Sequence, residues 1–117
     1  MSKNSEGTSI YPNDADGDAL RRVAARSDMS RPMSIDFMVA VPDESAGRAV
    51  AEGARVAGFE TTLECDEDSR SWTCYCTRTM LATYEGIIAA QSELDLLARS
   101  VGGYADGWGT SGNGQNS

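Results

Sequence analysis

The sequence predicts an α+β domain in which two helices cover one face of an antiparallel sheet. Apolar and polar residues alternate in separate short segments, and this period of two is typical of strands with one buried side. Two other segments repeat apolar residues every three or four positions, which predicts amphipathic helices. With 117 residues, the chain is long enough for one domain.

The first predicted strand and helix adjoin each other. In the strand, 33–41, alternate apolar residues face one way: Met33, Ile35, Phe37, Val39 and Val41. Pro42-Asp43-Glu44 ends this strand and begins a helix with acids in its first turn. The apolar stripe of the helix consists of small residues, which would let it lie close to a sheet: Ala46, Ala49, Val50, Gly53, Ala54 and Ala57. Gly58 stands where a C-terminal cap is expected.

A hairpin follows. Residues 59–65 alternate, with Phe59, Thr61, Leu63 and Cys65 facing inward. Asp66, Glu67, Asp68 and Ser69 form an acidic turn, and 70–79 is the return strand. The short connection favours antiparallel pairing of the two strands.

The longest predicted helix spans 83–101, with a stripe of Ile87, Ala90, Leu94, Leu97 and Val101. Gly102-Gly103 ends it, and 104–109 can add a short last strand. The order over residues 33–109 is therefore β-α-β-β-α-β, which is the order of a ferredoxin-like sandwich.

The two ends are polar. We expect a flexible arm at 1–17, one domain at 18–109 and a disordered tail at 110–117. Asp18 is the predicted N-cap of a short additional helix in which Leu20 and Val23 share one face.

The composition argues against an enzyme or a metalloprotein. The chain has no histidine, which removes the commonest general base and metal ligand. It also has no glycine-rich phosphate loop and no nucleophile elbow. We expect no catalytic residue, no cofactor and no metal. The three cysteines, Cys65, Cys74 and Cys76, contain no Cys-x-x-Cys pair and are expected to be reduced thiols in the core; a redox pair is the alternative.

Charge and hydropathy limit the classes of partner that the protein is expected to bind. No apolar run is long enough to cross a membrane, and residues 1–7 lack the features of a signal peptide, so a cytoplasmic protein is expected. Residues 33–117 hold thirteen acids and five bases, and so carry the whole net charge of −8. Such a surface repels nucleic acid and suits a basic protein, although the charge can also serve solubility alone.

The acids gather in one predicted place. The uncovered sheet face should present Asp36, Glu60 and Glu64 around one aromatic residue, Tyr75. RNA-binding sheets of this topology instead present aromatic and basic residues, so direct RNA binding is not expected. Asp66, Glu67 and Asp68 of the turn are the leading candidates for contacting a basic protein, with Asp36, Glu60, Glu64 and Tyr75 in support. An ordinary solvated sheet face is the alternative.

The segment after the long helix packs turn residues and aromatics closely. Gly102, Gly103, Asp106, Gly107 and Trp108 are expected mainly to stop the helix, make a tight turn and close the core. A tryptophan that contacts a partner is the alternative.

This ending resembles that of the regulator of ribonuclease activity B family. Other pieces agree in order across residues 17–109: Gly17-Asp18-Ala19-Leu20, Val41-Pro42-Asp43, Gly58-Phe59, and Thr77-Arg78-Thr79 after Trp72. Ala105 departs from the family's usual tyrosine, and the tail lacks an acidic end.

The resemblance implies a non-enzymatic regulator that binds ribonuclease E outside its catalytic part, on a basic region, and inhibits or redirects its cleavage of transcripts. Two other classes stay open. One is an immunity-type module for a different basic protein, and the other is a small ligand-binding domain of the same fold. The sequence leaves the oligomeric state open.

Overall fold

The computed structural model describes residues 11–113, which form three helices and four strands. Residues 1–10 of the predicted arm and 114–117 of the predicted tail lie outside the described part. In chain order the elements are α2 (Ala15–Ala24), β1 (Met33–Val41), α3 (Glu44–Val56), β2 (Glu60–Cys65), β3 (Trp72–Met80), α4 (Tyr84–Arg99) and β4 (Tyr104–Thr110).

The four strands form one sheet in the order β2-β3-β1-β4, and each neighbouring pair is antiparallel. The pairing of β1 with β3 is continuous from Met33 opposite Met80 to Val41 opposite Trp72. The predicted α+β class and the antiparallel sheet are therefore confirmed. The hairpin strand β3 begins at Trp72, so Arg70 lies in the connecting loop and not in the predicted return strand.

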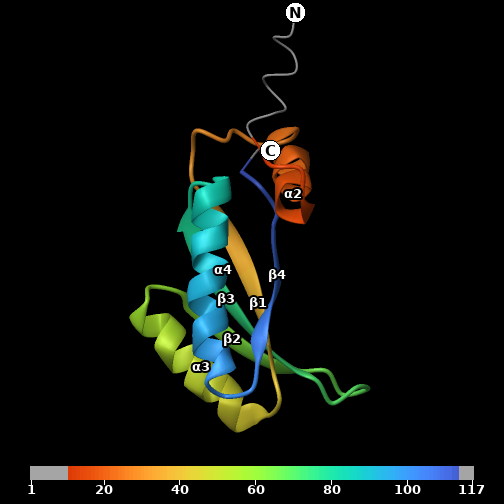
Figure 1. Cartoon of the computed structure of the whole chain (residues 1–117), viewed down its shortest axis with the longest axis vertical. Coiled ribbons are helices and arrows are strands. Elements are labelled where there is room, and N and C mark those ends of the chain that lie inside the picture. Colours follow the sequence, from red (N-terminus) through yellow and green to blue (C-terminus); the bar gives the residue numbers. More distant parts are fainter. Residues whose placement is uncertain (1–10, 114–117) are drawn as a thin grey trace, which may run out of the picture.

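The core lies between the sheet and the helices α3 and α4, which lie on one side of the sheet (Figure 1). The five inward residues of β1 are all buried, as the alternation predicts. The buried stripe of α3 differs from the prediction at three positions. Ala49 is exposed, whereas Gly47 and Ala51 are buried. The helix turns Gly47 toward β2, where an added Cβ would lie 2.4 Å from Cδ1 of Leu63.

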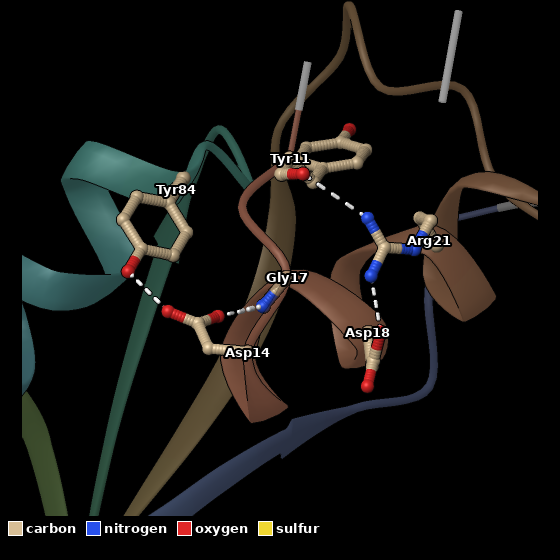
Figure 2. A network of polar contacts seen from close by, with 6 residues as sticks. All are labelled: Tyr11, Asp14, Gly17, Asp18, Arg21 and Tyr84. Atoms are coloured by element: carbon tan, nitrogen blue, oxygen red, sulfur yellow. Dashed lines mark hydrogen bonds and ion pairs between the residues drawn. The ribbon is translucent and has the colours of Figure 1, made fainter. Parts of the chain in front are cut away.

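The first helix, α2, begins earlier than predicted. Its N-cap is Asp14 and not Asp18, and Oδ1 of Asp14 accepts a hydrogen bond of 2.8 Å from the Gly17 amide. Oδ2 of the same carboxylate accepts a bond of 2.7 Å from the Tyr84 hydroxyl on α4 (Figure 2). The aspartate that caps the helix is therefore also bonded to a residue 70 positions further along the chain. Leu20 and Val23 are buried, as predicted.

Ordered contacts extend past both predicted domain boundaries. Tyr11 packs against the core, and its carbonyl accepts a bond of 3.1 Å from Arg21 (Figure 2). At the other end, the Asn113 amide donates to the carbonyls of Asp28, Arg31 and Pro32. Within residues 11–113 the longest helix is α4, with 16 residues, and no helix has the length and hydropathy needed to cross a bilayer.

Candidate protein-binding face

The side of the sheet opposite the helices carries the predicted contact residues. The strand register places them in rows across the sheet. Asp36 lies opposite Thr77, which in turn lies opposite Glu60. Next along the strands, Tyr75 lies between Met38 and Thr62. Two residues further on, Thr73 lies opposite Glu64, so the sheet brings Asp36, Glu60, Glu64 and Tyr75 onto one surface.

The hairpin loop continues this surface. Asp66 follows directly on β2, and Figure 1 shows the loop (green) reaching beyond the body of the domain, away from both helices. A shallow hollow of about 380 Å³ joins loop and sheet, lined by residues that include Glu64, Asp66, Ser69, Thr73 and Tyr75. We call Asp36, Glu60, Glu64, Asp66, Glu67 and Asp68 the acidic face.

The carboxylates of the three loop acids differ in their hydrogen bonds. Oδ1 of Asp66 accepts the backbone amide of Asp68 at 3.0 Å, so this carboxylate shapes the turn. The loop is closed by backbone bonds from the Asp66 amide to Ser71 and from the Arg70 amide to Asp66, and Arg70 has a left-handed backbone with φ of 62°. Glu67 and Asp68 use their carboxylates in no hydrogen bond or ion pair with the described residues, and both are exposed.

The acidic face has one neighbouring base for its six acids. Asp36 accepts a bond of 2.6 Å from the Thr77 hydroxyl, which is neutral. The four strands contain a single basic residue, Arg78, and its guanidinium lies on the helix side, 3.8 Å from the centroid of the Phe59 ring. Arg70 is the one base in the hairpin loop.

Ion pairs within residues 11–113 all involve the helices. Arg48 pairs with Glu44 and Arg99 with Asp95, each within one helix, and Arg21 pairs with Asp18 in α2. Arg78 of β3 reaches Glu93 of α4 at 3.9 Å. Within residues 11–113, these ion pairs neutralise acids on the helices, and none of them involves an acid of the acidic face.

Two of the three cysteines lie in the core, while Cys65, at the end of β2, also lines the hollow beside the hairpin loop. Cys74 and Cys76 are fully buried free thiols with their Sγ atoms 3.8 Å apart, and Cys65 is half-buried. The hydrogen bond with Cys74, together with burial, holds the pKa of the Cys76 thiol far above its ordinary value, so this thiol stays protonated. Among residues 11–113, no three Cys, Asp or Glu side chains are grouped to hold a metal ion.

The glycine and tryptophan motif has structural contacts. Gly102 ends α4 with a φ of 86°, and a Cβ on Gly103 would lie 2.3 Å from the Ala40 carbonyl oxygen. Gly107 has a φ of 115° where the pairing of β4 with β1 shifts register. The indole of Trp108 donates a bond of 2.8 Å to Asp16 of α2, while Asp106 is exposed.

Sequence reasoning missed a groove on the other side of β2. It has a volume of about 750 Å³ and lies between α3 and β2, with Arg48, Arg55, Leu63 and Trp72 among its lining residues. No sequence signal marks it, because the pattern of the chain does not say which strand lies at the edge of the sheet.

Comparison with curated protein sequences finds no match to this chain. A family model, described as regulator of ribonuclease activity B, matches residues 13–110, which cover α2 and the whole sheet. On this match, the chain belongs to the regulator of ribonuclease activity B family.

Proposed function

We propose that this protein is a non-enzymatic regulator that binds ribonuclease E through the acidic face and inhibits or redirects its cleavage of RNA. The observation that carries the proposal is the excess of these six acids over the single base beside them, Arg70, in a chain whose family regulates ribonuclease activity. Such a surface suits a basic segment of the enzyme.

The proposed mechanism is occupancy of a basic docking region. A basic segment that binds RNA or other proteins is less available for them when an acidic domain covers it. Association should be fast and sensitive to salt, because attraction between exposed charges is screened over about 10 Å at 0.1 M ionic strength. The protein itself would not touch RNA, since phosphates are repelled by the same charges. This mode of action belongs in the cytoplasm.

We also infer that the domain is a ferredoxin-like sandwich. Its β1 and β2 are connected through α3 and run parallel with β3 between them. In the same way β3 and β4 are connected through α4 and have β1 between them. Two interleaved β-α-β units of this kind support the assignment.

Matched charge variants test the function. In the first, Asp66→Asn, Glu67→Gln and Asp68→Asn remove three charges while Asn retains the side-chain oxygen that shapes the turn. In the control, Asp18→Asn, Glu85→Gln and Glu93→Gln remove three charges from the helices α2 and α4. At about 0.5 kcal/mol for each exposed charge, the first variant should bind ribonuclease E about tenfold more weakly in a calorimetric titration.

The control variant should bind within about twofold of the unmodified protein, since each of its exposed charges is distant from the contact. Inhibition of transcript cleavage should follow the same order as binding. If both variants bind ribonuclease E equally weakly, only the net charge of the protein matters for binding. If the first variant binds as tightly as the unmodified protein, the loop acids of the acidic face do not contact ribonuclease E.

A further inference from the structure

We infer that the free edge of β2 takes up an extended basic segment of the partner as a fifth strand of the sheet. The inference rests on the proposed function for the basic character of the partner. It adds how the partner is bound. The backbone of the added segment forms hydrogen bonds with β2, and its side chains point alternately to the two sides of the sheet, where they contact different residues.

The two edges of the sheet differ in their readiness to pair. At one edge, β4 has a register shift opposite Phe37 and Val39, with a left-handed Gly107 within it. Such an irregularity bends a strand and interrupts its ladder. At the other edge, β2 pairs with β3 without interruption from Glu60 to Cys65 and contains neither proline nor glycine. Its outer backbone groups therefore form a regular template for another strand.

The helix side of this edge is open. The inward residues of β2, Thr61, Leu63 and Cys65, are only half-buried, whereas the inward residues of β1 are fully buried. The groove of about 750 Å³ lies above them, between β2 and α3, and Trp72 lines it as well. Side chains on one side of an added strand would enter this groove and cover Leu63 and Trp72, and tryptophan is among the residues that dominate binding energy.

The two sides of β2 require different side chains from the added strand. On the open side, Glu60 and Glu64 stand on the edge strand itself, and cross-strand pairs of opposite charge are stabilising. On the groove side, Arg48 and Arg55 of α3 are balanced by Glu44 and Glu52, and Nη1 of Arg55 donates a bond of 2.9 Å to Thr61. With its charges balanced and Leu63 and Trp72 lining it, the groove suits apolar side chains. The occupant is therefore an extended segment in which basic residues alternate with apolar ones.

A second copy of this chain fits the edge poorly. If two β2 strands paired antiparallel about Thr62, Glu60 of each copy would lie opposite Glu64 of the other. Like charges directly opposite each other destabilise a strand pair. The acids on the edge therefore disfavour self-pairing and favour a basic strand.

A set of short peptides tests the backbone pairing. The probe is an acetylated, amidated heptapeptide, Lys-Val-Arg-Leu-Lys-Val-Arg, and its control has the same composition in blocks, Lys-Arg-Lys-Arg-Val-Leu-Val. Amides of successive residues in a strand point to opposite edges, so N-methylation of positions 2, 4 and 6 blocks one edge of the peptide and N-methylation of positions 3, 5 and 7 blocks the other.

The alternating peptide should bind at least fivefold more tightly than the block peptide, measured by calorimetry at 150 mM salt. It should also slow amide hydrogen exchange in β2. One N-methylated peptide should bind like the parent, and the other should lose at least tenfold in affinity. Equal affinity of the alternating and block peptides, or equal behaviour of the two methylated peptides, would overturn the inference.

A variant pair tests the edge in the whole protein. Thr62→Lys places a like charge beside the added strand, and Thr79→Lys makes the same change on β3, beyond the residues that pair with β2. We expect Thr62→Lys to weaken binding of both the alternating peptide and ribonuclease E about tenfold, and Thr79→Lys to leave both within about twofold. If both variants bind ribonuclease E as tightly as the unmodified protein does, the proposed function is supported and strand addition is ruled out. If the unmodified protein binds the alternating peptide but not ribonuclease E, strand addition at β2 is supported and the partner is a different basic protein.

Discussion

The indole of Trp108 links the two ends of the described chain. Its Nε1 donates a hydrogen bond of 2.8 Å to Asp16, which is 92 positions earlier and belongs to α2. The ring is partly buried against the core, and the same carboxylate accepts a longer bond of 3.4 Å from Gln91. Asp16 therefore joins α2 to both β4 and α4 with one side chain.

Trp108→Phe should lower the free energy of unfolding by about 1 to 2 kcal/mol, because a hydrogen bond to a carboxylate is lost while most of the ring packing remains. Urea denaturation measures this. In a double-mutant cycle with Asp16→Ala, the two changes should couple by about 1 kcal/mol. Purely additive effects would mean that the bond contributes nothing.

The sequence suggests a structural role for Trp108 but does not identify its hydrogen-bond partner. The position of the tryptophan after a helix and a glycine turn indicates a residue that closes the core. Its hydrogen bond depends on where α2 lies, and this is decided by tertiary contacts. The same reason explains the error at Asp18: three aspartates at positions 14, 16 and 18 are equivalent as caps in the sequence, and the hydroxyl of Tyr84 distinguishes Asp14.

The carboxylate of Asp14 also makes stability depend on pH. Hydrogen bonds from Tyr84 and then from the Gly17 amide lower its pKa below the ordinary value of 3.8. Because the unfolded chain then binds the proton more readily, the stabilisation is complete above the unfolded pKa and is lost as pH falls through the folded pKa. The pKa of Asp95 is lowered as well, by the Ala105 amide and Arg99, and acts in the same direction.

We therefore expect the free energy of unfolding to fall as the pH drops below about 4. In Tyr84→Phe this fall should be shallower, since the largest cause of the shift at Asp14 is removed. Tyr104→Phe is the matched control, because Tyr104 is exposed and its hydroxyl has no hydrogen-bond partner in residues 11–113. The check is urea denaturation from pH 6 to pH 2.5, and identical slopes for the two variants would contradict the assignment to Tyr84.

At the scale of elements, the turn from α4 into β4 positions the last strand. The Gly103 amide donates a hydrogen bond of 2.8 Å to the Ala98 carbonyl. A Cβ added to Gly103 would collide with the carbonyl oxygen of Ala40 in β1. A side chain at Gly103 would push β4 from β1, whereas Gly109 in the same strand has no atom within 4 Å of an added Cβ.

Gly103→Ala should therefore lower the free energy of unfolding by about 2 kcal/mol or more, in the range of overpacking changes. Gly109→Ala should leave it unchanged or raise it by up to about 0.5 kcal/mol, because the unfolded chain loses freedom. Thermal unfolding of the pair measures the difference. Equal melting temperatures would show that β4 can move to accept the methyl group.

Most elements could be predicted because their apolar periodicity is strong. The alternation of β1 gives its bounds and its buried side, and the stripe of α4 gives that helix to within two residues at each end. The buried side of α3 was predicted less accurately. Alanine and glycine fit either side of a helix, so Ala49 and Gly47 could not be told apart until the contact with Leu63 fixed the rotation. The order of the strands across the sheet, and hence the free edge at β2, has no signal in periodicity.

At the scale of the whole molecule, charge is separated between two sides. Three acids of the helical layer pair with Arg48, Arg78 and Arg99. The strands and the hairpin loop hold seven acids, one of them Asp106 of β4, and one exposed base, Arg70. The sequence predicted this concentration correctly, because alternation in the strands assigns each acid to a side. It could not predict that Asp66 also shapes the loop, since that depends on the turn geometry.

The most direct test of the central claim is a titration of the protein with ribonuclease E, as the full-length enzyme and without its basic non-catalytic region, at 50 and 300 mM salt. We expect binding that requires this region and weakens by at least tenfold at the higher salt. Binding that survives removal of the region, or that is insensitive to salt, would contradict the claim that the acidic face docks on a basic segment.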